Sequence, residues 1–495
     1  MSAAFPGIPA APPPPEPLLA TGVVVHRPGP GGREVLLVRR GAEQRFAGGF
    51  HAFPGGRLDP ADRDVPVAGA SGEAAALVAC ATRELFEETG MLLAEGASRV
   101  AIEARRRGRR ALLDGKGSWA GFLRENGLSL SAGLLVPAGR WVTPAWAPLR
   151  FDARFFLAEP PPGEREEIWP GELTVGGFVP AAVAVARWEK GELLFHPPQL
   201  HALRVLAAPG ELALERLRSP PESALRIEFQ RGIVLAALRT PTLPPATHTN
   251  AWLVSDGDGT AVVDPGAPDA AEQAKLFGML DALAAEGRPP REVWLTHAHA
   301  DHVGAAGAVS ARYGIPVKAH RLAAGRVPDA SIVPIREGDL LGGRFLALET
   351  PGHAREHLVF LDERSGAVLC GDLVSTLSTI VIDPPEGDMA EYVRQLERIR
   401  SLGPRTLFPA HGPPAPDGMG RLGTYIAHRR EREALVIAAL ERGGTLAEVT
   451  ARAYEDTPPA MYPVAERSCL ASLLKLRDEG RAREHGGRWS LARNG

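Results

Sequence analysis

The most restrictive feature of this sequence is a short segment, THAHADH at residues 296–302, which is dense in metal-ligand side chains. It directly follows an apolar run that is typical of a buried strand. Alternate residues of an extended chain point to the same side. His297 and His299 can therefore bind one ion, whereas Asp301 and His302 turn toward a neighbouring position. The chain must fold so that further ligands reach this segment.

Three more candidate ligands each follow a predicted strand: His353 comes after FLALETPG, Asp372 after AVLCG and His411 after TLFPA. Because all three follow strands, they can converge at one edge of the sheets. We expect two ligand triads and a bridge, namely His297, His299 and His353 on one ion, Asp301, His302 and His411 on the other, and Asp372 between them.

This ligand set also indicates the chemistry. Imidazole and carboxylate ligands suit Zn²⁺, with Mn²⁺ and Fe²⁺ as alternatives. The expected site leaves coordination positions open for water, as a catalytic site requires. Two cations lower the pKa of a shared water toward neutrality and hold the substrate oxygen. We therefore expect a hydrolase in which Asp301 orients the nucleophile.

A second carboxylate cluster lies near the N-terminus, in ATRELFEETGM at residues 81–91. Glu84, Glu87 and Glu88 are three and four residues apart, so they share one face of a helix. Clustered carboxylates repel one another unless cations lie between them, and oxygen-only ligands favour Mg²⁺ or Mn²⁺. Such a site activates water against a diphosphate bond, with Glu87 and Glu88 as the expected catalytic residues.

The chain divides into blocks that suggest an arm and three domains. Residues 1–17 contain four consecutive prolines and predict a disordered arm. Residues 18–220 begin with two strand patterns, and residues 226–415 alternate strands with helices, so both predict α/β architecture within an α+β multidomain chain. Residues 420–495 read as three helices followed by a Gly-Gly hairpin, which is the pattern of a winged helix.

The block at 226–415 resembles the metallo-β-lactamase superfamily in the segments THAHADH, PGHAREH, CGD and PAHG. The resemblance implies an αββα sandwich with the metal site at the sheet edges. With HRREREAL and the winged-helix tail, the chain looks most like the lactamase-beta-2 type, whose animal members are endoribonucleases acting on single-stranded RNA. Asn250 matches an early strand of that group, and His357 is expected to shape the loop of its PGHAREH motif.

The first block resembles Nudix hydrolases in ATRELFEETGM and in the preceding FPGG, which implies an α/β/α sandwich. It departs from the usual motif in two ways. The segment between Gly56 and Arg83 is longer by about 13 residues. The first glutamate of the motif is replaced by Ala75, and we expect Glu73 to substitute for it.

The segment LLVRRGAEQRFAGGFHAFPGG also resembles the coenzyme A-recognition motif of CoA-diphosphatase relatives. Arg40 and Arg45 belong to it, and both are expected to bind substrate phosphates bidentately. The resemblance therefore implies a nucleoside diphosphate or CoA derivative as the small-molecule substrate of this block.

Composition excludes several classes of protein. The net charge of −3 gives no overall basic excess for nucleic acid or an acidic membrane. Only three widely spaced cysteines are present, which is typical of a reducing compartment rather than of a disulfide framework. No secretory signal and no membrane-spanning apolar run is recognisable, so we expect a cytoplasmic protein without a membrane partner.

Two questions stay open at the level of sequence. The block at 226–415 can act on RNA phosphodiesters or on esters and acyl thioesters. A mild basic excess in the tail weakly favours RNA, but a winged helix can instead pack on the catalytic domain. The Nudix-like block can be catalytic, or it can be a nucleotide- or CoA-sensing module that regulates its neighbour. The departures at Ala75 and in the lengthened segment motivate this alternative.

Overall fold

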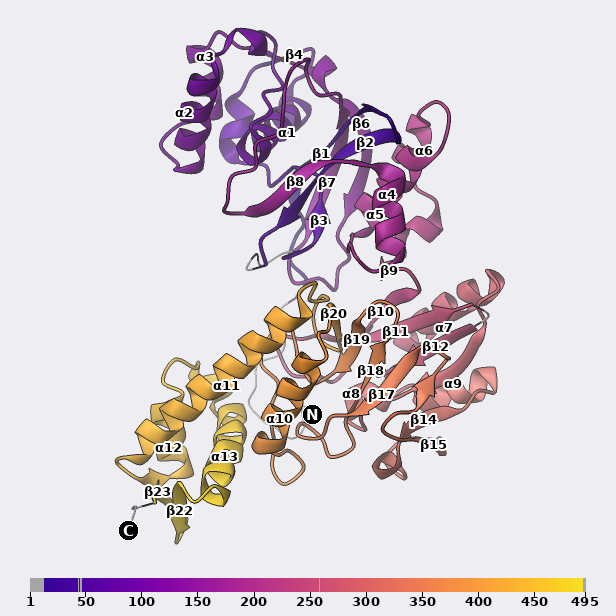
Figure 1. The fold of residues 1–495 in the computed structure, drawn as a ribbon, viewed down its shortest axis with the longest axis vertical. Helices are drawn as coiled ribbons and strands as arrows, with labels where there is room; N and C mark the ends of the chain where they lie inside the picture. Colours follow the sequence, from indigo (N-terminus) through magenta and orange to yellow (C-terminus); the bar gives the residue numbers. More distant parts are fainter. Residues whose placement is uncertain (1–12, 43, 45–46, 258, 493–495) are drawn as a thin grey trace. The chain divides into compact units, whose positions relative to one another are not determined.

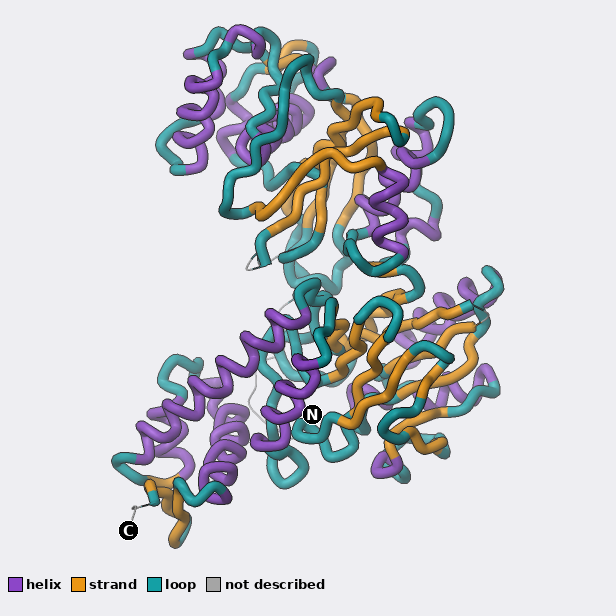
Figure 2. The backbone as a smooth tube through the Cα atoms, viewed as in Figure 1, coloured by secondary structure: helices purple, strands orange, loops and turns teal. Residues whose placement is uncertain are grey.

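The computed structural model describes residues 13–42, 44, 47–257 and 259–492. Most of the expected N-terminal arm lies outside the described residues. The chain forms two compact units, Pro13–Arg231 and Gly232–Gly495. Figures 1 and 2 show that both combine sheets with helices, which confirms the mixed α/β multidomain class.

The first unit is built on a mixed sheet with the strand order β3-β2-β1-β7-β6, and β8 pairs with β2. Its strands are β1 (Leu18–Gly29), β2 (Gly32–Arg40), β3 (His51–Ala52), β6 (Val136–Val142), β7 (Phe151–Ala158) and β8 (Leu173–Pro180). Its helices are α1 (Gly72–Thr89), α2 (Ile102–Leu113), α3 (Trp119–Glu125), α4 (Ala181–Glu189), α5 (Pro197–Ala207) and α6 (Leu214–Arg218). The short strands β4 (Val67–Ala68) and β5 (Leu130–Ser131) pair with each other.

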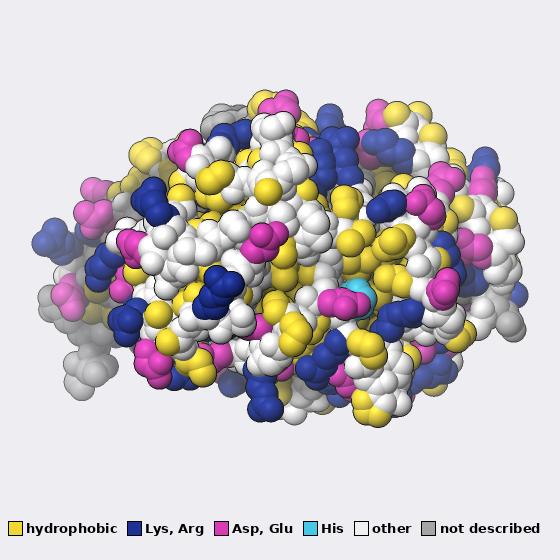
Figure 3. All heavy atoms as spheres, turned by 90° about the horizontal axis from the view of Figure 1, so that it is seen from above, with side chains coloured by type: hydrophobic (Ala, Val, Ile, Leu, Met, Phe, Trp, Pro, Cys, Tyr) yellow, Lys and Arg dark blue, Asp and Glu magenta, His cyan; other side chains and the backbone are white. Residues whose placement is uncertain are grey.

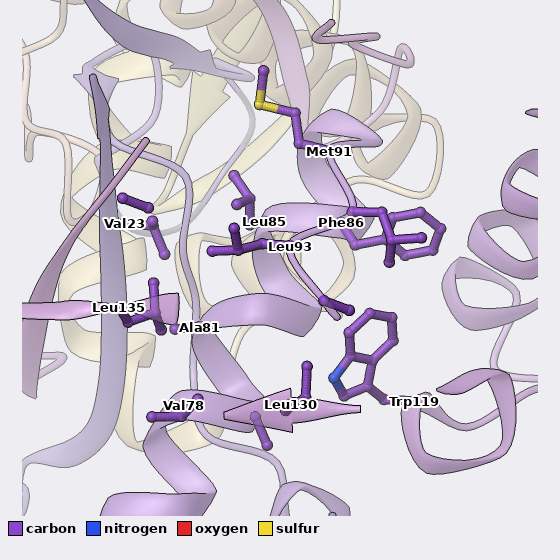
Figure 4. Packing of buried hydrophobic residues seen from close by; sticks show 14 of the residues in the cluster. Val23, Val78, Ala81, Leu85, Phe86, Met91, Leu93, Trp119, Leu130 and Leu135 are labelled. Carbon is purple, nitrogen blue, oxygen red and sulfur yellow. The ribbon is translucent and has the colours of Figure 1, made fainter. Parts of the chain in front are cut away.

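Alternation along β1 places helices on both faces of this sheet. Val23 and Val25 pack into a core with α1 and α3. Val24 points to the opposite face and packs with α4 and α5, because successive side chains of a strand face opposite ways. Figure 4 shows the first of these cores, in which Phe86 of α1 lies against Trp119 with ring centroids 5.5 Å apart. The unit is therefore an α/β/α sandwich.

The second unit contains two sheets. In the first, strands run in the order β15-β14-β13-β12-β11-β10, and in the second in the order β16-β17-β18-β19-β20. The first sheet comprises β10 (Ile233–Arg239), β11 (His248–Asp256), β12 (Gly259–Val263), β13 (Pro290–Trp294), β14 (Val317–His320) and β15 (Ile332–Ile335). The second comprises β16 (Leu340–Leu341), β17 (Phe345–Glu349), β18 (Leu358–Asp362), β19 (Ala367–Gly371) and β20 (Thr406–Pro409).

The two sheets pack face to face through aromatic side chains, and helices cover their outer faces. The rings of Trp252 and Phe408, one from each sheet, have centroids 5.1 Å apart. Helices α7 (Ala270–Ala285) and α9 (Ala306–Tyr313) pack on the first sheet. Helices α10 (Met389–Ser401) and α11 (Gly418–Leu440) pack on the second. The order of layers is therefore αββα.

The C-terminal part of this unit consists of three helices and a small sheet. Helix α11 continues from the sandwich and is followed by α12 (Leu446–Ala453), α13 (Tyr462–Asp478) and the hairpin β22 (Ala482–His485) and β23 (Arg488–Leu491). The hairpin turn is Gly486–Gly487, and both glycines have positive φ, as a tight hairpin turn requires. The short strand β21 (Gly444–Thr445) pairs with β23. The expected winged-helix pattern is present.

No helix among the residues that the structure describes is both long and apolar enough to cross a membrane.

Candidate metal centres

The candidate ligands of the second unit come from loops that follow four different strands. The segment with His297 and His299 follows β13, and α8 (Ala300–Val303) begins at once and carries Asp301 and His302. The remaining loops bring three further side chains to the same edge: His353 after β17, Asp372 after β19 and His411 after β20. The structure thus brings together all seven candidates.

Three histidines form the first cluster. His299 Nδ1 lies 2.9 Å from His297 Nε2 and 3.0 Å from His353 Nε2. Burial and the neighbouring imidazoles lower the pKa of His297 well below its usual value, and they lower that of His353 to about 4. His297 and His353 are therefore neutral near pH 7, as metal ligands must be, and the ring nitrogens of all three histidines converge.

The second cluster contains Asp301, His302 and His411, and Asp372 lies between the two clusters. Asp372 Oδ2 is 3.5 Å from His353 Nε2 and 3.6 Å from His302 Nε2. Its other oxygen, Oδ1, is 3.4 Å from His411 Nε2. One carboxylate thus faces ligands of both clusters, which is the position that a bridging ligand needs.

Unpartnered atoms show that these residues fit divalent cations. Both carboxylate oxygens of Asp301, Oδ1 of Asp372 and Nε2 of His302 are buried without a hydrogen-bond partner among the described residues. Burial lowers the pKa of His302, but the carboxylates around it outweigh this effect and raise the pKa well above its usual value. A buried polar group without a partner is costly. Divalent cations would satisfy both the orphaned atoms and the excess negative charge.

Asp264, which the sequence did not single out, orients two of the ligands. It follows β12, and its Oδ2 accepts from His302 Nδ1 at 2.9 Å and from Thr296 Oγ1 at 2.7 Å. Thr296 Oγ1 in turn lies 3.0 Å from His297 Nδ1, which can donate to it. This chain fixes both imidazoles with Nε2 toward the metal centre, which is the usual function of residues behind metal ligands.

Other motif residues hold the ligand loops. The backbone N–H of Asp372 donates to His357 Nε2 at 3.1 Å, so His357 positions the bridging carboxylate. Asn250 Nδ2 donates to the carbonyls of Pro409 and Gly412, which flank His411, at 2.9 and 2.7 Å. Both residues support the site without facing it.

A cavity of about 250 Å³ opens onto this centre. Its floor contains Asp301, His353, Asp372 and His411. Its side walls come from the loop after β10 and from the loop after Asp372, at residues 242–246 and 375–381. The remaining wall is formed by the C-terminal helices, namely by His428, Arg429, Arg432, Tyr454, Thr457, Met461, Val464, Ala465 and Ser468. The winged-helix part is therefore structurally part of the site.

The candidate ligands of the first unit lie on α1, opposite a glycine turn. Glu88 Oε2 accepts from the N–H of Gly55 at 2.8 Å. A Cβ at Gly56 would lie 2.4 Å from the carboxylate carbon of Glu84, so a larger residue at this position would displace that carboxylate. Burial raises the pKa of Glu84 to about 7, and burial together with Glu84 raises that of Glu88 well above its usual value. A bound cation would stabilise the charged form of these carboxylates and would take the place of their protons.

The glutamate missing from the motif is replaced by Asp62, and the expectation that Glu73 substitutes for it is wrong. Asp62 binds Arg83 in a bidentate ion pair, with Nε–Oδ1 at 2.8 Å and Nη2–Oδ2 at 2.9 Å. Arg83 also reaches Glu84 and Glu87 at 2.8 and 2.9 Å. Glu73, in the first turn of α1, is exposed. The lengthened segment thus itself supplies the missing carboxylate.

Replacing Asp62 with asparagine is expected to weaken this unit. The variant leaves two guanidinium N–H groups of Arg83 without their charged acceptor, which should lower the free energy of unfolding by about 1–3 kcal/mol. Chemical unfolding of the full chain measures the change. Glu73→Gln is the matched control and should leave stability unaltered. Equal stability of the Asp62→Asn variant and the wild type would contradict the assignment.

The candidate phosphate-binding arginines can be placed only in part. Arg40, at the end of β2, donates to Glu172 Oε1 at 2.8 Å. Arg45 lies outside the described residues. Another arginine, Arg109, holds the end of α1 instead, because it donates to the carbonyls of Glu87 and Glu88, both at 2.9 Å. It belongs to the basic run at residues 104–110, which therefore has a structural function at this position.

Comparisons with known proteins agree with this arrangement. Residues 244–411 match the family described as the metallo-beta-lactamase superfamily, residues 445–489 match the beta-lactamase associated winged helix domain, and residues 16–122 match the NUDIX domain. These matches cover the two candidate centres and the helices α12 and α13 of the cavity wall, whereas α11 lies between the matched segments 244–411 and 445–489.

Similar proteins include relatives of the second unit and of the first. The chain is 26% identical over 260 residues to the beta-lactamase-like protein 2 homolog of Drosophila melanogaster, covering 49% of this chain and 87% of the relative. It is 30% identical over 267 residues to the lactamase-like protein nscB of Trichophyton rubrum, covering 50% and 78%. A crystal structure of a NUDIX hydrolase from Alicyclobacillus acidocaldarius is 32% identical, with a TM-score of 0.37, and covers 42% of this chain and 99% of that one.

Proposed function

Because the chain belongs to the metallo-β-lactamase superfamily and carries a Nudix domain ahead of that fold, we propose that it is a hydrolase with two separate metal-dependent sites. The lactamase-fold half would hydrolyse a small ester or thioester at a binuclear, zinc-type centre. The Nudix half would cleave a diphosphate-containing nucleotide or CoA derivative. The observation that carries the proposal is the position of Asp372 between two ligand clusters, together with the buried, unpartnered atoms of Asp301, His302 and Asp372 among the described residues.

The residues of the lactamase-fold centre have distinct functions. Bound cations would supply a water of lowered pKa and polarise the substrate oxygen. His297, His299 and His353 would hold one cation, and Asp301, His302 and His411 the other. Asp301 would also orient the nucleophile, since neither of its oxygens has a hydrogen-bond partner among the described residues. Asp264 keeps the imidazoles of His297 and His302 in the required orientation.

The cavity supports a small substrate with an apolar portion. Its outer walls include Leu243, Ile380, Met461 and Val464, and concave, mostly apolar sites of this kind are typical of small-molecule binding. Helix α13 turns much of its surface inward, since Val464 lines the cavity and Ala471 packs in the core of the sandwich. A nucleic-acid-binding winged helix would instead present its third helix to a groove. An ester or thioester is therefore favoured over RNA.

The one face of the molecule drawn in Figure 3 gives no added support for nucleic acid. On the face drawn in Figure 3, Lys and Arg side chains are interspersed with Asp and Glu among the described residues. Nucleic-acid sites usually gather basic side chains into a patch or stripe.

The Nudix proposal rests on the geometry of α1. Glu84 and Glu88 converge on the turn at Gly55 and Gly56, and Arg83 and Arg109 fix the helix around them. Mg²⁺ or Mn²⁺ would suit this oxygen-only set.

Metal removal and restoration test the proposal. We expect purified protein to bind two transition-metal ions per chain at the lactamase-fold centre. Chelation should abolish hydrolysis of acyl thioesters, and Zn²⁺ should restore it. The same preparations are assayed on single-stranded RNA and, with Mg²⁺, on CoA and nucleoside diphosphate derivatives. RNA cleavage without thioester hydrolysis would overturn the substrate class, and metal-independent turnover would overturn the mechanism.

A further inference from the structure

Arg429 is a buried cation on the wall of the lactamase-fold cavity. It lies on α11, it is 7% exposed, and it lines the cavity. Its Nη2 donates to the carbonyl of Ile380, its guanidinium lies 5.2 Å from the ring centroid of Tyr392, and its Nε has no hydrogen-bond partner. No carboxylate among the described residues forms an ion pair with it.

The neighbouring cations of α11 are arranged differently. Arg430 is exposed and pairs with Glu397, and Arg432 pairs with Asp456 in a bidentate manner. His428 also lines the cavity, but burial and the two nearby arginines lower its pKa, so it carries no charge near neutral pH. Among the described residues that line this wall, Arg429 is therefore the charged group without a carboxylate partner.

A buried charge that lacks a counter-ion is strongly unfavourable unless a ligand supplies the opposite charge. The guanidinium of arginine also matches carboxylate and phosphate groups in geometry. We propose that the substrate of the lactamase-fold site carries an oxyanion, a carboxylate or a phosphate, that pairs with Arg429. This inference rests on the proposed hydrolytic function, and it specifies the substrate class as an anionic ester or thioester.

Arg429 is also linked to one candidate metal ligand through the loop at residues 380–381. It binds the carbonyl of Ile380, and the next carbonyl, that of Val381, accepts from His353 Nδ1 at 2.8 Å. A bound oxyanion at Arg429 would therefore be held near the centre. The same connection gives the competing explanation, in which Arg429 only positions His353. In that case replacing Arg429 would lower the affinity for metal and would slow the hydrolysis of all substrates equally.

Binding and kinetics separate these explanations. Calorimetry with succinate and with inorganic phosphate is run on chelator-treated wild type, Arg429→Gln, Arg429→Lys and the exposed matched control Arg430→Gln. We expect one of the two anions to bind the wild type and the control, and to bind Arg429→Gln about 10–100-fold more weakly. Arg429→Lys should recover part of the affinity. Which anion binds identifies the oxyanion as a carboxylate or a phosphate.

The kinetic arm compares a neutral and an anionic ester on metal-loaded protein, 4-nitrophenyl acetate and mono-4-nitrophenyl succinate. If the oxyanion is a carboxylate, Arg429→Gln should raise KM for the succinate ester with little change for the acetate. An equal loss of activity on both esters, together with a lower metal content, would overturn the proposal and would show that Arg429 has a positioning role. Failure of both anions to bind wild type would also overturn it. If neither ester is hydrolysed, the proposed hydrolytic function is wrong. The calorimetric result still shows whether an oxyanion binds at Arg429.

Discussion

Replacing Asp372 with asparagine is expected to reduce lactamase-fold hydrolysis by roughly 10³-fold and to lower the metal content below two ions per chain. Asp372 is buried and faces ligands of both clusters at 3.4–3.6 Å, so the neutral amide removes the charge that the two sites share. A metal used as a Lewis acid contributes several kcal/mol to catalysis, and each 1.4 kcal/mol is a factor of ten. Steady-state rates and elemental analysis measure both effects.

Two further variants show whether the loss is specific. Asp264→Asn alters a residue behind the ligands and should reduce metal affinity or activity by only about 10–100-fold. Asp281→Asn removes an exposed carboxylate that pairs with Arg312, and it should behave as the wild type. Full activity of Asp372→Asn with two bound metals would refute the bridging position.

The second large effect is expected in the Nudix half. Glu88→Gln should reduce diphosphate hydrolysis by about 10²–10³-fold, because it removes a carboxylate from the cation site that activates water. Hydrolysis by the lactamase-fold half should be unchanged, because the two sites belong to separate compact units. Parallel assays of both activities on one preparation provide the measurement.

This variant also tests the idea that the Nudix half is a sensor. A non-catalytic module would show no diphosphate hydrolysis in the wild type, and Glu88→Gln would then alter only the ligand response of the other half. Glu73→Gln, an exposed change on the same helix, is the control. Unchanged diphosphate hydrolysis in Glu88→Gln would exclude the proposed role of this carboxylate.

The convergence of the candidate ligands was predictable because each lies in a short motif next to a strand. The position of a strand end is a local property, and ends of neighbouring strands meet at one edge of a sheet. His297 and Asp372 could thus be placed together from sequence although 74 residues separate them. The layer order followed from the resemblance and from the alternation of strands and helices.

The supporting residues were not predictable, because their partners are set by tertiary packing. Asp264 ends an ordinary apolar strand, and only pairing of β12 with β13 brings it to Thr296. Asp62 lies in the lengthened segment, where motif spacing gives no guide, so the nearby Glu73 was a plausible but wrong choice. Arg429 sits in a basic segment of a helix, and the composition of that segment does not reveal that the side chain is buried at the cavity wall.

Helix α11 belongs to two cores at once. Its first half packs Leu422 and Ile426 into the sandwich, and its second half packs Val436 and Leu440 into the winged-helix core. An unbroken helix of 23 residues is a rod of about 34 Å. Residues downstream of it, such as Tyr454 and Met461, wall the cavity and do not belong to the candidate ligand clusters found among the described residues. The part of the cavity wall that follows Leu440 can therefore be altered without changing any of the seven candidate metal ligands, because all of them precede α11 in the chain.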